Sequence, residues 1–250
     1  MSCFKLGLCS VTFRKKTIEE IAEIAEIAGV DFIEWGADVH VKNLDEAKKA
    51  KAICYEKNIR ISSYGSYFNA ISYDEGEWEK VCAIAKEMEA GSVRIWLGKK
   101  DSEKTDSAEY KTLVNNLNKM CETAKKYDLL VCPECHDNTF NNNTDSFLKI
   151  AKEINKENFR TYFQSRYFRK SYDLDRIERT YDYIENVHIS YRDLKKEQMF
   201  RTKDRKYIDT ILKTLDARKY TGIVMIEFVI RDSERQLMKD INRLKKYMSA

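Results

Sequence analysis

Residues 5–35 read KLGLCSVTFRKKTIEEIAEIAEIAGVDFIEW, and this stretch decides the fold. Two short apolar runs, 5–11 and 32–35, have the length and composition of strands. The apolar residues between them recur at helical spacing: Ile18, Ile21, Ala22, Ala25 and Ala28. A helix that is apolar on one face and lies between two strands is the repeating unit of a parallel sheet.

The same unit recurs along the rest of the chain. Six further strand-like runs are RISSY (60–64), SVRIWL (92–97), LLVCPE (129–134), FRTYFQ (159–164), VHISY (187–191) and IVMIEF (223–228). Helical periodicities separate them, as in Leu113, Leu117, Cys121 and Ala124. Eight strands alternating with eight helices predict one domain over residues 1–250, a closed (β/α)8 TIM barrel. The alternative, an open doubly wound sheet, usually has a glycine-rich loop after its first strand, and CSVTFRKK (9–16) contains no glycine.

Two helix starts have the residues of a capping box. These are Thr17-Ile-Glu-Glu20 and Ser233-Glu-Arg-Gln236. In a capping box the first side chain accepts a hydrogen bond from a backbone N–H of the first turn, and the fourth side chain returns one to the cap. We therefore expect helices to begin directly after Thr17 and Ser233.

Charge and hydropathy exclude several classes of protein. The 45 basic and 41 acidic residues leave a net charge of +4 and are interspersed, so no basic stripe for nucleic acid is visible. The apolar runs fall far short of the ~20 residues of a membrane span. The N-terminal segment MSCFKLGLCSVTF lacks the apolar core of about 7–15 residues that a secretory signal contains. We expect a cytoplasmic protein without a nucleic-acid or membrane partner.

The cysteines support a reducing compartment. Seven are scattered along the chain, an odd number that does not resemble a disulfide framework. Cys132-Pro-Glu-Cys135 has the spacing of a redox pair or of half a zinc site, and this reading stays open. Against it, the motif ends a strand and has no second C-x-x-C partner.

Polar residues gather where the predicted strands end. In this fold such positions line the active site. They include Glu34, Arg94, Glu134, Gln164, His188 and Glu227. The chain has three histidines, His40, His136 and His188, and each falls in or just after a strand rather than on a helix.

Glu227 lies within the apolar run Ile223–Ile230, where an unpaired carboxylate would be costly. Such a group is normally paired, for which Arg94 is a candidate, bound to a metal ion, or protonated. Carboxylate, imidazole and amide donors on neighbouring strands suit Mn²⁺, Mg²⁺, Co²⁺ or Zn²⁺ better than a metal that prefers thiolates.

At these residues the sequence resembles the sugar phosphate isomerase/epimerase superfamily, the xylose isomerase-like barrels, and within it an uncharacterised bacterial branch. The resemblance covers nearly the whole chain. Its motifs stand here as GLCSVTFR (7–14), IEWGADVHV (33–41), YGSYF (64–68), VRIWLG (93–98), Glu134-Cys135-His136 with Thr139 and Thr144, Phe163-Gln164, Val187-His188-Ile189 and IEFV (226–229).

The resemblance implies a metal-dependent sugar or sugar phosphate isomerase or epimerase that transfers a proton next to a carbonyl through an enediolate. The implied ligands of one divalent ion are Glu134, Gln164, His188 and Glu227. Glu134 and Glu227 are the implied acid/base pair. The implied substrate contacts are Trp35, His40, Arg94, Trp96, His136 and Arg192, with barrel packing as the alternative role of Trp35 and Trp96. A homo-oligomer is left open.

Gln164 departs from the family pattern. The characterised epimerases commonly have an aspartate at this position, so the site here has two carboxylates where those enzymes have three. Weaker metal binding is expected. Strand seven continues Ser190-Tyr191-Arg192-Asp193, where the resembling branch tends to have a tryptophan, so substrate contacts are expected to differ.

Two other functions remain in competition. An endonuclease-IV-like nuclease shares the fold but needs several zinc ions, more histidines and a basic face. A sugar-binding or regulatory barrel without metal or turnover is the non-enzymatic alternative, and Gln164 favours it. Fold does not fix the substrate, and the sequence leaves isomerisation, epimerisation and dehydration open.

Overall fold

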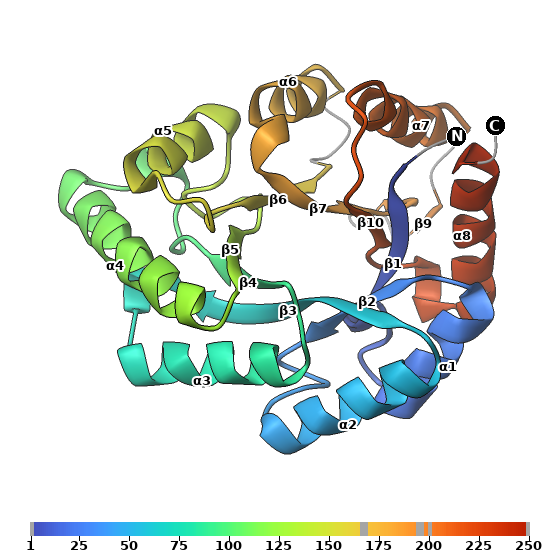
Figure 1. Cartoon of the computed structure of the whole chain (residues 1–250). Helices are drawn as coiled ribbons and strands as arrows, with labels where there is room; N and C mark the ends of the chain where they lie inside the picture. The colour runs from blue at the N-terminus through green and yellow to red at the C-terminus, as the bar shows by residue number, and fades with distance from the viewer. Residues whose placement is uncertain (1–2, 166–169, 194–197, 200–201, 249–250) are drawn as a thin grey trace.

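The computed structural model describes residues 3–165, 170–193, 198–199 and 202–248. Within these ranges, eight parallel strands form one sheet: β1 (Lys5–Cys9), β2 (Phe32–Gly36), β3 (Arg60–Asn69), β4 (Ser92–Trp96), β5 (Leu130–Pro133), β6 (Thr161–Gln164), β7 (Ile184–Ile189) and β10 (Ile223–Ile226). The helices are α1 (Ile18–Ala28), α2 (Leu44–Glu56), α3 (Glu75–Glu87), α4 (Ser107–Lys126), α5 (Thr144–Ile154), α6 (Lys170–Thr180), α7 (Thr202–Ala217) and α8 (Glu234–Met248). Figure 1 shows the strands curved into a barrel with the helices outside, which confirms the predicted fold.

The barrel is continuous except for one weak junction. The strand order is β5-β4-β3-β2-β1-β10-β7-β6, with a parallel ladder between each neighbouring pair. The two end strands, β5 and β6, meet through a single bridge between Val131 and Phe159. Beside it, the Val131 N–H donates to the Asn158 carbonyl at 2.8 Å, and the Arg160 N–H donates to the Val131 carbonyl at 3.0 Å. We call this junction the β5–β6 seam.

Side-chain alternation sorts the strand residues into two layers. Successive residues of a strand point to opposite faces of the sheet. One large cluster contains the residues that face the helices, among them Leu8, Ile33 and Trp35. A second, small cluster fills the barrel interior and consists of Cys9, Val11, Cys132, Tyr162 and Met225. Polar residues of the interior-facing set therefore reach the barrel axis.

The two predicted capping boxes have different outcomes. At α1, Thr17 accepts from the Glu20 N–H at 3.3 Å, and the Glu20 side chain accepts from the Thr17 N–H at 2.7 Å, so this box is confirmed. At α8, Ser233 accepts from the Gln236 N–H at 3.3 Å. The return bond is not made, because the Ser233 N–H donates to the Ile230 carbonyl and the Gln236 side chain donates to Asp240.

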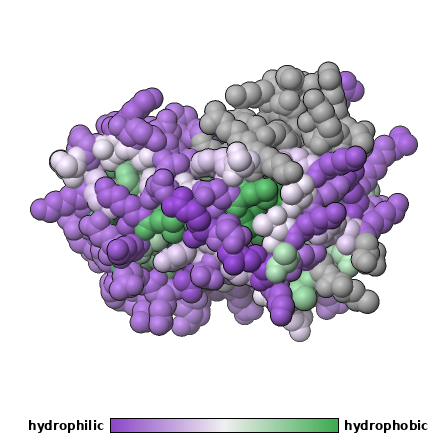
Figure 2. Space-filling view, turned by 90° about the horizontal axis from the view of Figure 1, so that it is seen from above, coloured by the Kyte–Doolittle hydropathy of each residue, from purple (hydrophilic) through white to green (hydrophobic). Residues whose placement is uncertain are grey.

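One feature was not predicted: a two-residue antiparallel pair, β8 (Arg192–Asp193) with β9 (Gln198–Met199). The surface in Figure 2 is mainly hydrophilic outside the grey atoms, as expected for helices whose outer faces are charged. In the described ranges, every helix is too short or too polar to cross a membrane.

Candidate metal and acid–base site

The four residues predicted as metal ligands meet at one end of the barrel. Gln164 ends β6, His188 lies in β7, and Glu134 and Glu227 directly follow β5 and β10. One donor atom from each of Glu134, His188 and Glu227 lies within 4.8 Å of the other two. Gln164 joins them, because its Nε2 donates to Glu227 Oε2 at 3.2 Å. Barrel closure thus brings together side chains that are up to 93 positions apart in sequence.

Arg94 supplies a positive charge within this group. It extends from β4, and its Nη1 lies 2.6 Å from Glu134 Oε2 and 3.9 Å from Glu227 Oε1. Its Nε lies 3.6 Å from Glu34 Oε1 on the other side. Burial opposes the charged form, but these three carboxylates together raise the Arg94 pKa well above its ordinary value. The guanidinium therefore stays charged and would compete with a metal ion for Glu134.

Glu34 is a member of the cluster to which the sequence assigned no role. It lies in β2 and is only 2% exposed. Ser63 donates to its Oε2 at 2.8 Å, and His188 Nε2 lies 3.5 Å from the same oxygen. Burial alone would raise the Glu34 pKa, but Arg94 and His188 outweigh it and lower the pKa to about 2. Glu34 is therefore a permanent negative charge inside the barrel.

Gly65 makes room for this arrangement. A Cβ at position 65 would lie 3.0 Å from Glu34 Oε1 and 3.1 Å from Arg94 Nη2. Any side chain here would press on both charged groups. Packing beside the Glu34–Arg94 ion pair therefore explains why the YGSYF motif has a glycine at this position of β3.

His188 lies between two carboxylates. Its Nδ1 is 3.6 Å from Glu227 Oε2, and its Nε2 faces Glu34. Burial lowers the His188 pKa, but Cys9, Glu34 and Glu227 raise it, and the result is well above the ordinary value. Burial also raises the pKa of Glu227, with His188 acting in the opposite direction. A cation that binds at His188 must displace a proton, so binding would depend on pH.

Unsatisfied atoms in this group fit a metal ion. Among the residues that the structure describes, His188 Nδ1 and Nε2 and Gln164 Oε1 are buried without a hydrogen-bond partner. A buried polar atom without a partner is costly. Lone pairs of imidazole nitrogen and amide oxygen, next to two carboxylates, form an N/O donor set for a divalent cation. The residues present therefore fit the ion that the sequence implies.

An aromatic group borders the same site. Trp96 ends β4, and its ring centroid lies 4.7 Å from that of His136 and 6.2 Å from that of Tyr67, with which it is stacked. The Arg94 guanidinium lies 5.4 Å from the Tyr67 centroid. These rings place aromatic surface next to the charges of the site, a combination that can contact both the faces and the hydroxyls of a sugar. Tyr67 was not predicted.

Trp35 and His40 are not brought to the site. Glu34 faces the interior, so Trp35, the next residue of β2, faces the helices and is fully buried there. His40 packs against it with ring centroids 6.0 Å apart, and its Nδ1 contacts Ser10 Oγ at 3.0 Å. Both residues therefore make packing contacts in this structure, and their substrate contacts stay a prediction. Arg192 lies in β8, and its side chain falls outside the described residues.

Asn141 fixes the strand end that carries Glu134. Its Nδ2 donates to the carbonyls of Pro133 and Glu134 at 3.1 and 3.0 Å, and reaches Thr161 Oγ1 at 3.2 Å. Arg176 from α6 donates to the Asn141 amide oxygen at 2.6 Å. Asn141 thus ties β5 to β6. It lies in an asparagine run that the sequence alone marks only as a loop.

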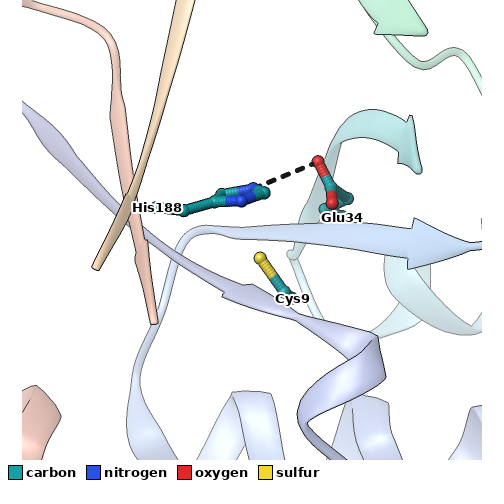
Figure 3. Close-up of side chains that lie close together, drawn as sticks. All are labelled: Cys9, Glu34 and His188. Carbon is teal, nitrogen blue, oxygen red and sulfur yellow. Dashed lines mark ion pairs between the residues drawn. The ribbon is translucent and has the colours of Figure 1, made fainter. Parts of the chain in front are cut away.

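The C-x-x-C motif takes no part in a ligand group. Cys132 belongs to the barrel interior, and burial raises its pKa well above the ordinary value. The potential metal-ligand groups found in the described part of the chain contain neither Cys132 nor Cys135. Cys9 does contribute: Figure 3 shows its sulfur beside Glu34 and His188, with which it forms a second close group.

Comparison with known proteins agrees with this architecture. The sequence pattern of the xylose isomerase-like TIM barrel family matches residues 21–247, and the chain belongs to that family. Over 167 residues the chain is 23% identical to a 3-dehydroshikimate dehydratase of Bacillus anthracis. That match covers 62% of this chain and 60% of the relative, less than two thirds of its length.

Two solved structures show how far the fold is shared. The crystal structure of a probable 3-DHS dehydratase from Bacillus anthracis superposes with a TM-score of 0.81 at 17% identity, over 97% of this chain and 99% of that one. An E. coli 3-keto-D-glucoside 4-epimerase superposes with a TM-score of 0.75 at 14% identity, over 99% and 100%. At these identities the likeness concerns the fold.

Proposed function

We propose that the protein is a metal-dependent enzyme that transfers a proton next to the carbonyl group of a sugar or sugar phosphate, as an isomerase or epimerase. One observation carries this proposal: two buried glutamates and a histidine converge at the C-terminal ends of the strands, with an amide beside them. Active sites of this fold lie at that end. The epimerase likeness of the fold supports the reaction class.

The proposed ion would be held by Glu134, Gln164, His188 and Glu227. When bound, a divalent ion polarises the substrate carbonyl and so acidifies the neighbouring C–H group. One of the two carboxylates, Glu134 or Glu227, then removes that proton. The other returns a proton at the adjacent carbon in an isomerisation, or on the opposite face of the same carbon in an epimerisation.

The surroundings of Glu227 suit a proton-transfer group. Its pKa is raised by burial, which brings the carboxyl closer to the operating pH of an enzyme. Glu134 is oriented by its ion pair with Arg94, 2.6 Å away. Arg94, Trp96 and His136 border the same space, where they can orient substrate hydroxyls or a phosphate.

Dehydration is a second candidate, favoured by the 3-dehydroshikimate dehydratase that matches in sequence. The first step would be the same removal of a proton next to the carbonyl. The hydroxyl on the next carbon would then leave as water, taking its proton from the second carboxyl group. The substrate would be a β-hydroxy ketone.

One experiment separates these reactions from a barrel that only binds sugar. Chelator-treated protein is reloaded with Mn²⁺ or Zn²⁺ and incubated in D₂O with free ketoses, ketose phosphates and 3-dehydroshikimate. We expect metal-dependent deuterium incorporation next to the carbonyl of one substrate, detected by NMR, and the product then identifies the reaction. Thermal stabilisation by a sugar, without exchange or turnover in any metal-loaded sample, would contradict an enzyme and favour the binding protein.

A further inference from the structure

We propose that Glu34 is a positioning residue for His188: it accepts the proton on Nε2 and thereby directs the Nδ1 lone pair toward Glu227 and the proposed metal ion. This inference rests on the proposed function, since it assigns a partner to one of its ligands. Glu34 would not contact the ion or the substrate.

The two edges of the His188 ring face different carboxylates. Nε2 lies 3.5 Å from Glu34 Oε2, and Nδ1 lies 3.6 Å from Glu227 Oε2. A neutral imidazole has one N–H donor and one lone pair, and the hydrogen bond at one nitrogen decides which atom is left to bind a metal. Nδ1 is the nitrogen that faces the proposed ligand Glu227, so the proton belongs at the opposite edge.

Glu34 is well suited to hold that proton because it is itself fixed. Ser63 donates to its Oε2, Arg94 lies 3.6 Å from its Oε1, and Gly65 leaves the space that its carboxylate fills. These contacts come from β3 and β4, across the barrel from β7. Metal-binding histidines commonly donate their second N–H to a carboxylate in this way, which fixes the ring and increases its basicity.

A ring contact limits the other motions of the imidazole. The Tyr162 ring lies 4.9 Å from the His188 ring, centroid to centroid, at an interplanar angle of 49°. The carboxylate at one edge and this tilted aromatic ring together restrict rotation of the imidazole.

The rival assignment is a second metal ion held by Cys9, Glu34 and His188 Nε2, the group drawn in Figure 3. Two observations favour the hydrogen bond over this ion. Arg94 already presents a positive charge to Glu34. Ser63 already donates to Glu34 Oε2 at 2.8 Å, and this is the oxygen that faces His188, so it is less available to an ion.

Nitrogen NMR on ¹⁵N-histidine-labelled protein distinguishes the two, because the chain has three histidines to assign. Zn²⁺ is the probe because it is diamagnetic. We expect one Zn²⁺ per chain, a zinc-dependent shift of His188 Nδ1, and a slowly exchanging, downfield proton on Nε2. In Glu34→Gln this proton should move upfield and exchange faster, and zinc affinity should fall by about 10–100-fold. Glu185→Gln, at the other end of β7, is the matched control and should change neither property.

Each other result has a definite meaning. Two zinc ions per chain without a proton on Nε2, with one ion lost in Cys9→Ser, would overturn the positioning role in favour of the second metal. An Nε2 proton that is unaffected by Glu34→Gln would also overturn the positioning role. If zinc still binds at Nδ1 in that case, the proposed metal site stands. Zinc without any effect on His188 would overturn both the inference and the proposed metal site. If Glu34→Gln does not fold, the wild-type zinc count and Nε2 signal decide the question.

Discussion

The guanidinium of Arg94 lies 2.6 Å from a carboxylate oxygen of Glu134, and the two side chains are 2% and 3% exposed. An ion pair this deep has lost most of its hydration, so each partner depends on the other for compensation. Arg94 is also close to Glu34 and Glu227, so its guanidinium shares a cluster of three carboxylates with the protonated His188. The balance changes if a metal ion enters.

Replacing Arg94 by methionine should therefore make the protein depend on metal for stability. We expect metal-free Arg94→Met to lose about 3–5 kcal/mol of unfolding free energy, because Glu134 loses its ion-pair partner and Glu34 and Glu227 lose a nearby positive charge. Mn²⁺ should restore more stability to the variant than it adds to wild type, as measured by urea unfolding. Arg243→Met is the control: its pair with Asp209 is a third exposed and should be worth less than about 1 kcal/mol. Equal stabilisation of Arg94→Met and wild type by Mn²⁺ would argue against competition between Arg94 and the metal.

Gln164→Asp should bind the metal more tightly than wild type. The change adds a negative charge beside Glu227 and so strengthens the Coulomb attraction for a cation. Gln164→Asn is the matched control, because it has the shorter side chain of the aspartate without its charge. Calorimetric titration of Mn²⁺ and Zn²⁺ into the three chelator-treated proteins ranks them. If Gln164→Asp binds no more tightly than Gln164→Asn, charge is not what limits metal affinity.

Glu134→Gln and Glu227→Gln should each stop proton transfer while the fold survives. The amide keeps the shape of the side chain but cannot accept the proton, and general acid–base groups contribute about 10²–10⁴-fold to rate. The measurement is the rate of deuterium incorporation into the substrate that the D₂O experiment identifies, with circular dichroism to verify the fold. Either variant retaining near wild-type exchange would remove that residue from the acid/base pair.

Glu34 should give the metal-free protein a characteristic loss of stability in acid. Its folded pKa of about 2 lies below the ordinary 4.5, so its contribution is complete above pH 4.5 and is lost as the pH falls toward 2. The size is roughly 3 kcal/mol, at about 1.36 kcal/mol for each tenfold change in proton affinity. Urea unfolding between pH 2 and 5 should show a shallower decline for Glu34→Gln than for wild type. Parallel curves for the two proteins would mean that Glu34 is not stabilised as its contacts indicate.

The alternation of apolar runs was enough to predict the barrel, because each strand and helix is encoded within a few consecutive residues. The meeting of Glu134, Gln164, His188 and Glu227 followed from their place at strand ends, since closure brings those ends together. Their roles remain proposals. From the sequence, Arg94 was a candidate ion-pair partner of Glu227, whereas in the structure Arg94 lies nearer to Glu134.

Residues in β2 were harder to assign. Glu34 and Trp35 are neighbours, so only one of them can face the interior, and both sides of a barrel strand are buried. The sequence therefore does not show which of the two points inward. Cys9 and Glu34 become neighbours only through the register of β1 and β2, which pairs them directly. Such cross-strand contacts depend on pairing that no local pattern records.

The β5–β6 seam has a mechanical consequence. Glu134 follows β5 and Gln164 ends β6, the two strands that meet at the seam. The backbone ladder is reduced there to one bridge, and the side chains of Asn141 and Thr161 form hydrogen bonds across it. The distance between these two proposed ligands is thus set at the least reinforced joint of the ring. An ion bound to both residues would cross-link β5 and β6 and make the whole barrel more rigid. The amide protons of Val131 and Arg160 lie in the β5–β6 seam, so metal binding should slow their hydrogen exchange.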